Sequence, residues 1–452
     1  MNDLDPHSNS GLDNPHSNAE ENVGIDTYIT SSPGIGGEIK NQPDYFYVEE
    51  VSRLPELHDD GRFAIIKVKK SDWTTMNFAK VLSNVLRISQ KRVNFAGTKD
   101  KKAVSVQYFS VSNLNPEDIA KLKETEIKDA EIEYIGNARR AVRLGDLVGN
   151  FFHIILEGIQ RENENENETE DSIMEIIGDL KEKGVPNYFG LQRFGSIRFI
   201  THEVGKHILK KDFESAFWVY VARPFPHESR DIRKIREELW ESRDPRTGLK
   251  ELPKHFGYER NLLQKYLESG SEEKALLSLP KYLKMMFVHA YQSYIFNRLI
   301  SDRIREFGSL KAVQKGDFAD FIRNEQTDSQ KYPSLMESYS RVKDDNLERV
   351  RFLIDNYRGF LAFPLPGYET RLEDEWASEK IRAILQEDSI ELPDFKGKYK
   401  EFSSKGDYRV ADMPYASLSY ALDDSNARFS FFLPKGCYAT SFLREFTKNL
   451  TI

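Results

Sequence analysis

The fold is decided around the stretch Val93-Asn94-Phe95-Ala96-Gly97-Thr98-Lys99-Asp100-Lys101-Lys102-Ala103-Val104. A short β-branched and aromatic run ends at Phe95, and a second run with alternating polar residues extends from Val104 to Val111. Runs of this composition predict strands. The glycine-led polar hexapeptide between them predicts a hairpin loop with Asp100 at or near its tip.

Further elements are predicted on both sides of this hairpin. Alternation or apolar runs predict strands, apolar residues at helical spacing predict helices, and the acidic Asn/Glu tract predicts a solvated loop. The expected strands are 45–48, 63–68, 151–156 and 429–433; the expected helices are 74–87, 173–181 and 281–307; the expected acidic loop is 162–171.

Sheet-like segments at both ends of the ordered chain enclose a block of long, charged, amphipathic helices. The 452 residues also exceed the usual size of one hydrophobic core. We therefore expect an α+β catalytic fold interrupted by a second domain. The expected divisions are a disordered tail over 1–36, a catalytic domain formed by 37–204 and 406–452, and a mainly helical insertion over 205–405.

Composition excludes several classes of protein. No apolar run approaches the roughly 20 residues of a membrane span. The single cysteine, Cys437, cannot form an internal disulfide, and the N-terminus has no secretory signal pattern. We expect a protein of a reducing interior, in the cytoplasm and not in a membrane.

Charge is distributed unevenly along the chain. The formal net charge is −8, yet residues 65–104 contain ten lysines and arginines and only two aspartates. A basic region inside an acidic protein is typical of an enzyme that holds one part of a polyanion. An ordinary solvated face of mixed strands and helices would give the same pattern.

The histidines do not predict a metal site. His202 and His207 are five residues apart, whereas the zinc motif on a helix places its two imidazoles four residues apart. Because the sequence also has no glycine motif for nucleotide phosphates, we expect the chemistry to depend on side chains alone, without metal or cofactor.

Asp100 is the strongest candidate for that chemistry. Three lysines within two positions favour its ionised form, and an ionised carboxylate on a loop can serve as nucleophile or base. The competing interpretation is that Lys-Asp-Lys-Lys is merely a polar turn.

A family resemblance favours the catalytic interpretation. Residues 94–104 are similar to the active-site motif of the tRNA pseudouridine synthase D (TruD) family, as are 40–46 and 185–195, with weaker similarity at 143–150, 287–297 and 433–445. The matches occur in family order from about 38 to 446. The resemblance implies a pseudouridine-synthase-like catalytic domain, with a mixed, mainly antiparallel sheet flanked by helices and interrupted by a largely helical insertion.

The resemblance also implies a reaction and a substrate. Uridine in a tRNA, expected at position 13 of the D arm, would be flipped out and isomerised to pseudouridine. Asp100 would act at the ribose, Lys40 would keep its carboxylate ionised, Phe189 would stack on the uracil, and Asn187 would position the loop or bond the base. No obligate protein partner is expected. The predicted RNA contacts are Lys67, Lys69, Lys91, Arg92, Lys99, Lys101, Lys102, Arg143, Arg193 and Arg444.

Two other functions remain open at this point. The basic region and aromatic residues would also suit a noncatalytic protein that binds structured RNA. A nucleoside or glycoside hydrolase would need a second carboxylate beside Asp100, for which Glu49 or Glu50 are candidates.

Overall fold

The computed structural model describes residues 15–39, 42–159, 166–323, 332–423 and 425–448. Lys40 therefore lies outside the described residues, as do 1–14 of the expected tail. No helix in the described ranges is long and apolar enough to cross a membrane.

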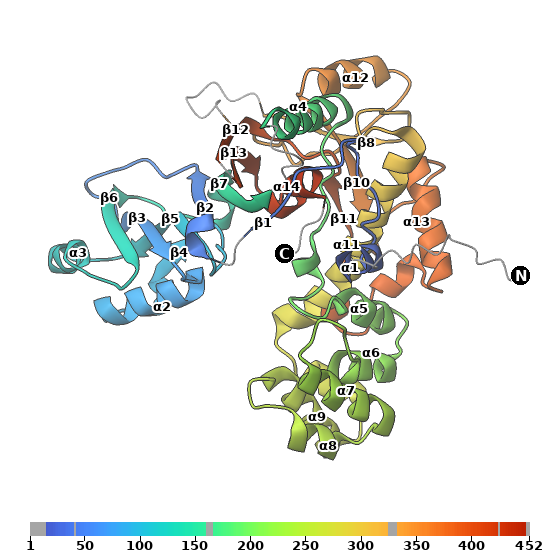
Figure 1. Cartoon of the computed structure of the whole chain (residues 1–452). Coiled ribbons are helices and arrows are strands. Elements are labelled where there is room, and N and C mark those ends of the chain that lie inside the picture. The colour runs from blue at the N-terminus through green and yellow to red at the C-terminus, as the bar shows by residue number, and fades with distance from the viewer. Residues whose placement is uncertain (1–14, 40–41, 160–165, 324–331, 424, 449–452) are drawn as a thin grey trace, which may run out of the picture.

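The largest element of the fold is a nine-stranded mixed sheet (Figure 1). Its main path runs β12-β13-β7-β2-β5-β3-β6, while β1 pairs with β7 and β4 pairs with β5. Among the described strands of this sheet, β2 and β5 pair in parallel and the other pairs are antiparallel. The strands are β1 Gly36–Ile39, β2 Phe46–Ser52, β3 Phe63–Ser71, β4 Val93–Phe95, β5 Val104–Ser112, β6 Ala130–Ala138, β7 Leu147–Ile159, β12 Ala416–Asp423 and β13 Asn426–Pro434.

Helices cover one face of this sheet at both of its ends. At one end, α2 (Thr75–Leu86) begins where the Thr74 side chain accepts a hydrogen bond from the Asn77 amide, and Phe78 packs on Phe109. The short α3 (Pro116–Lys123) follows on the same side. At the other end, α14 (Ala439–Thr447) places Phe442 with its ring centroid 4.5 Å from that of Phe431 on β13.

The middle of the chain is mainly helical and also contains a second, four-stranded sheet. Helix α11 begins and ends at the predicted residues, Lys281 and Phe307. The helices are α5 Thr201–Leu209, α6 Phe213–Ala222, α7 Arg230–Ser242, α8 Pro245–Glu251, α9 Gly257–Ser269, α10 Glu272–Leu277, α11, α12 Leu347–Asp355 and α13 Trp376–Glu387. The second sheet has the order β11 (Asp407–Val410), β10 (Gly359–Leu365), β8 (Phe318–Phe321), β9 (Ser340–Arg341). Because β11 pairs with β10, this sheet crosses the boundary that we expected at residue 405.

The sequence-based expectation was wrong for the described part of the N-terminal tail. Residues 15–22 form helix α1, and Val23, Ile25, Ile29 and Ile35 are buried in the main core. The buried Glu445 carboxylate on α14 accepts hydrogen bonds from backbone and hydroxyl groups of the segment at Thr30. These apolar residues are widely spaced in a polar segment, so they give no periodic signal.

The expected acidic loop was also partly wrong. Helix α4 runs from Glu166 to Lys183, so residues 166–171 are helical, and the rest of the predicted loop, residues 162–165, lies outside the described residues.

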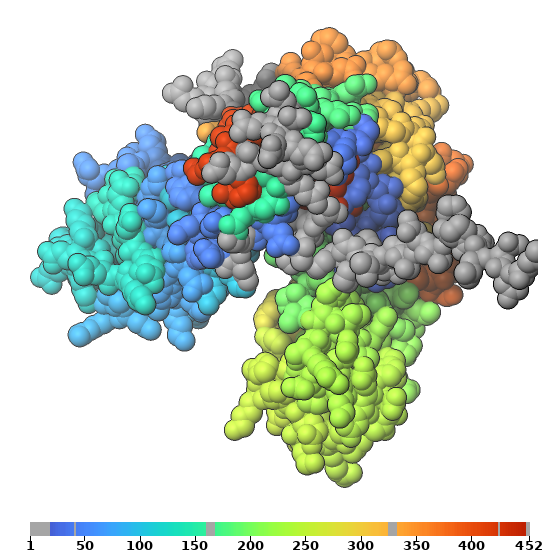
Figure 2. Space-filling model, viewed as in Figure 1, coloured from blue at the N-terminus to red at the C-terminus, as the bar shows by residue number. Residues whose placement is uncertain are grey.

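The elements form three lobes. Figure 1 shows β3–β6 with α2 and α3 on one side, α5–α9 below, and the remaining sheet with α11–α14 between and above them. Figure 2 shows open space between the lobe that carries α2 and the helical lobe of α6–α9.

Candidate active site

The predicted hairpin loop is held down by a buried ion pair. Strand β4 pairs antiparallel with β5, as expected. Between them, the Lys99 ammonium lies 2.8 Å from Oε2 of Glu50, with side-chain exposures of 4% and 0%. The Lys99 amide donates to the Thr75 hydroxyl at 2.9 Å, and the Gln107 side chain donates to the Gly97 carbonyl. The loop is thus fastened to β2, β5 and the start of α2.

Asp100 is exposed directly beside this anchor. Lys101 and Lys102 are also exposed, and the Lys101 ammonium lies 3.7 Å from Asp72. Behind the loop, the buried Lys70 ammonium donates to the Ser105 hydroxyl at 2.7 Å. Burial, followed by the nearby charge of Lys99, lowers the pKa of Lys70 to about 8, while the charges of Asp100 and Glu50 oppose this shift. The loop therefore presents one carboxylate to solvent in a cationic setting.

A cavity of about 320 Å³ contains two other predicted site residues, Asn187 and Phe189. Asn187 is completely buried, and its side-chain amide donates to the Val410 carbonyl at 2.9 Å. The Phe189 amide donates to the Asn297 side chain on α11 at 2.8 Å. Backbone and amide groups of β11 and α11 thus fix the position of this segment.

The sheet register relates this cavity to the loop. Glu50 on β2 is opposite Asn150 on β7, which is opposite Leu433 on β13. Lys435, a cavity residue, follows Leu433 by two positions. Since adjacent strands are about 4.8 Å apart, the backbones of Glu50 and Leu433 lie about 10 Å apart across the sheet, and Lys435 lies about 7 Å further along the chain.

Phe189 is 6% exposed, and arginines flank its ring. The Arg409 guanidinium carbon lies 3.9 Å from the ring centroid, and that of Arg193 lies 5.4 Å from it. The predicted stacking surface for uracil is therefore shared with guanidinium groups. Arg409 was not predicted, since a lone arginine in a short strand carries no sequence signal.

The predicted RNA contacts divide into groups. Lys101, Lys102, Lys91 and Arg143 are exposed. Lys67 and Lys69 lie on the sheet face opposite the loop, because Lys67 pairs with Glu49 whereas the loop anchors on the adjacent Glu50. This register does not bring them together with Asp100.

Internal hydrogen bonds also hold Arg193, whose Nε donates to the Ser293 hydroxyl at 3.1 Å, and the three remaining predicted RNA contacts. Arg92 donates to the Ser112 carbonyl at 2.8 Å. Lys99 is buried on Glu50, so the anchor replaces the phosphate contact that we expected from it. Arg444 is buried and its guanidinium Nη2 lies 2.9 Å from Glu20, which corrects the expectation of a free phosphate-binding charge. An isolated sequence position does not reveal burial of this kind.

The histidines lie in a packed helix. His202 on α5 is buried, stacks on Tyr294 with centroids 5.1 Å apart, and has a pKa lowered to about 3 chiefly by burial. No group of three or more potential metal ligands occurs among the residues described.

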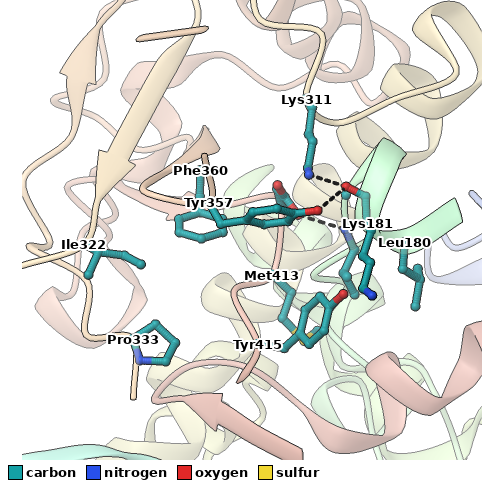
Figure 3. Close-up of a pocket in the computed structure, with 12 residues that line it drawn as sticks. Leu180, Lys181, Lys311, Ile322, Pro333, Tyr357, Phe360, Met413 and Tyr415 are labelled. Atoms are coloured by element: carbon teal, nitrogen blue, oxygen red, sulfur yellow. Dashed lines mark hydrogen bonds between the residues drawn. The ribbon is translucent and has the colours of Figure 1, made fainter. Parts of the chain in front are cut away.

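A second cavity, of about 260 Å³, lies behind the Asn187 segment (Figure 3). Asp412 lines it at 2% exposure, and Oδ1 accepts a hydrogen bond from the Val185 amide at 2.8 Å. Burial raises the pKa of Asp412 to about 7, while the charge of Lys311 partly opposes the shift. As Figure 3 shows, Lys311 and Tyr357 both donate to the Lys181 carbonyl at the edge of this cavity.

Comparisons with known proteins agree with this architecture. The family model described as tRNA pseudouridine synthase D (TruD) matches residues 22–446. A curated protein from Archaeoglobus fulgidus, named "Probable tRNA pseudouridine synthase D", is 56% identical, with 95% of this chain and 99% of that protein covered. A protein of the same name from Methanosarcina barkeri is 36% identical, with 95% and 97% covered.

A solved structure has the same fold. The crystal structure of a TruD protein from Methanosarcina mazei superposes with a TM-score of 0.81 at 33% identity, covering 95% of this chain and 98% of that one. Fold, site and comparisons together define an RNA-modifying isomerase, one that makes pseudouridine in tRNA. The chain belongs to the tRNA pseudouridine synthase D (TruD) family.

Proposed function

We propose that the protein isomerises uridine 13 in the D arm of cytoplasmic tRNA, with Asp100 as the catalytic carboxylate. The observation that carries this proposal is the anchored loop: the buried Lys99–Glu50 pair fixes the backbone on one side of Asp100 while Asp100 itself remains exposed. A fixed backbone places the carboxylate with little loss of conformational freedom when substrate binds.

The target base must leave the RNA stack before it reacts. The 320 Å³ cavity is within the usual range for a small-molecule site, and it offers the Phe189 ring as an apolar wall. Asp100 then acts at the ribose, either by adding to C1′ or by removing a proton beside it. Asn187, whose side chain is bonded to β11 and to Arg409, shapes the cavity wall.

The arrangement of carboxylates argues against a hydrolase. Of the two candidates for a second carboxylate, Glu50 is buried in the ion pair with Lys99. Glu49 points to the other sheet face, where it pairs with Lys67. Neither is free to activate water beside Asp100.

The test is the Asp100→Asn variant, assayed by mass spectrometric mapping of pseudouridine in a tRNA transcript. We expect tRNA binding to be retained and product to be lost, with no free uracil released by the parent enzyme. Asp344→Asn, at an exposed carboxylate paired with Lys315, is the matched control and should keep full activity.

A second substrate tests the proposed target position separately from the catalytic role of Asp100. A transcript with cytidine at position 13 should yield no pseudouridine in the D arm. Product formation by Asp100→Asn would overturn the catalytic assignment, and product at other uridines only would overturn the assignment of position 13.

A further inference from the structure

Two partly buried arginines beside Phe189 differ from the arginines that pack inside the described part of this protein. Neither Arg193 nor Arg409 forms an ion pair with a carboxylate of the described chain. By contrast, Arg236 pairs with Glu228 at 2.6 Å. The other buried arginines with carboxylate partners are Arg198 with Glu259, Arg303 with Asp317 and Arg444 with Glu20.

The Arg409 guanidinium is fixed by hydrogen bonds, and one of its N–H donors has no acceptor in the described structure. One terminal nitrogen donates to the Asn187 carbonyl at 3.2 Å and to the Asn187 side-chain oxygen at 2.8 Å. The Nε of Arg409 is buried and has no acceptor in the described structure. Arg409 also lines the cavity that contains Phe189.

The electrostatic setting of this guanidinium is unfavourable without a ligand. Burial lowers the pKa of both Arg409 and Arg193; at Arg409, Tyr438 and Cys437 oppose this shift and the charge of Arg193 adds to it. An arginine remains protonated in proteins, so Arg409 keeps its positive charge, while Glu337, a carboxylate that lines the same cavity, is paired with Lys435 at 2.8 Å. A buried charge without a partner is costly, and a ligand group that carries negative charge would offset that cost.

On the basis of the function proposed above, we propose that Arg409 stabilises the negative charge that develops on the uracil ring when its bond to the ribose breaks. The N1–C1′ bond breaks heterolytically and its electron pair leaves with N1, so uracil becomes an anion whose charge is shared with its two carbonyl oxygens. Asp100 acts on the electron-deficient sugar, and the Arg409 guanidinium stabilises the negatively charged base.

The remaining steps restore the atom and charge balance. The ring turns, C5 forms the new bond to C1′, the C5 proton is released and N1 takes up a proton, so the net reaction is an isomerisation without an oxidant or reductant. While the uracil ring turns, it needs a neighbouring surface that favours no single orientation of the ring. Stacking on the face of Phe189 provides such a surface. A positive charge above that wall attracts the anion in each orientation.

The same charge could serve a different anion, a backbone phosphate beside the flipped nucleotide. The two roles predict different kinetics. A phosphate contact strengthens binding of substrate and transition state equally, whereas stabilisation of the uracil anion occurs only as the bond breaks.

The experiment compares Arg409→Gln and Arg409→Lys with Arg351→Gln. Arg351 on α12 is exposed and pairs with Glu348, so it is the matched control. We expect Arg409→Gln to lower kcat by about 100-fold, the usual effect of losing one preorganised donor, with KM for tRNA changed by less than about threefold. Arg409→Lys keeps the positive charge but not the planar pair of donors, so its kcat should lie between those of the parent enzyme and Arg409→Gln.

A substrate with a better leaving group separates electrostatic from structural effects. In a transcript with 5-fluorouridine at the target position, the base is more acidic and its anion needs less stabilisation. Because fluorine replaces the C5 hydrogen, the rate followed on both substrates is loss of the original N-linked nucleoside, which reports N1–C1′ cleavage. The loss of rate in Arg409→Gln should therefore be at least tenfold smaller on this substrate than on uridine. If Arg409→Gln folds poorly, the same comparison is made with Arg409→Lys.

Three results would overturn the inference. A raised KM with unchanged kcat would assign Arg409 to a phosphate, an equal loss on both bases would assign it to structure, and unchanged kinetics would give it no role. Asp100→Asn is measured in parallel. If this variant still makes pseudouridine, the proposed function itself fails. If it makes none while the Arg409 variants keep the kinetics of the parent enzyme, the inference about Arg409 alone is rejected.

Discussion

The ammonium of Lys99 lies 2.8 Å from the carboxylate of Glu50, and both side chains are almost completely withdrawn from solvent. The residue that follows Lys99 in the chain is the exposed Asp100. The buried pair thus fixes the backbone beside the carboxylate that we propose to be catalytic, and neither member of the pair needs to touch substrate for this.

Breaking this pair should be more damaging than removing it. Lys99→Met or Glu50→Leu leaves one buried charge without a partner, and we expect each to reduce the free energy of unfolding by about 3 to 5 kcal/mol. The double variant should recover at least half of that loss. Urea unfolding of the four proteins measures the cycle, and single variants within about 0.5 kcal/mol of the parent would contradict it.

Asp412 should make stability depend on pH. Its pKa is raised to about 7 in the folded protein by burial, from an ordinary value of 3.8. Between these values the folded state keeps a proton that the unfolded state has released, so the free energy of unfolding falls as pH rises from about 4 to 7 and is level above that. Each pKa unit corresponds to about 1.4 kcal/mol.

The Asp412→Asn variant removes this dependence while it retains an oxygen for the Val185 amide. We expect the free energy of unfolding of the variant, minus that of the parent protein, to increase as the pH is raised from 5 to 8. Chemical unfolding of both proteins in matched buffers measures this difference. A constant difference between the two proteins over this range would show that Asp412 does not titrate there. Lys311 and Tyr415, which interact electrostatically with Asp412, are unchanged in both.

The exposed lysines of the loop should bind RNA phosphates. Replacing Lys101 and Lys102 by alanine should weaken tRNA binding and reduce the slope of log K against log salt by about 0.7 to 0.9 for each phosphate that the protein no longer neutralises. Lys67→Ala with Lys69→Ala, on the opposite sheet face, is the matched pair. Equal effects of the two double variants would mean that tRNA also covers that face.

Arg444 should matter for stability and not for RNA affinity. Its guanidinium pairs with Glu20, donates to the Thr27 carbonyl at 2.8 Å and stacks over Tyr28 at 3.8 Å. Arg444→Met should therefore release the N-terminal segment and cost about 3 to 5 kcal/mol. The prediction is supported if a protease cleaves the variant near residues 20–30 while the salt dependence of tRNA binding is unchanged. It is contradicted if this segment resists the protease as it does in the parent protein.

Local patterns were sufficient for much of the fold. Helix α11 has the bounds that apolar spacing predicted, α2 lies within the predicted range 74–87, and the hairpin of β4 and β5 follows from two strand-forming runs around a glycine-led turn. Such features depend on residues that are neighbours in the chain, so the sequence contains the whole signal.

Other features depend on partners far away in the chain. The segment 23–35 is ordered by contacts with α14, more than 400 residues later, and the second sheet joins β8, β9 and β10 to β11 across the expected domain boundary. No local pattern predicts either, because the stabilising groups come together only when the chain is folded.

The candidate site divides in the same way. By itself, the sequence determined the hairpin that carries Asp100 and the family to which the chain is similar, because a motif is a local property. The tertiary structure alone decided that Lys99 turns inward to Glu50 and that Arg409 stands unpaired over Phe189. Burial and charge compensation are set by whatever surrounds a side chain in space, and for these residues the surroundings come from distant strands and helices.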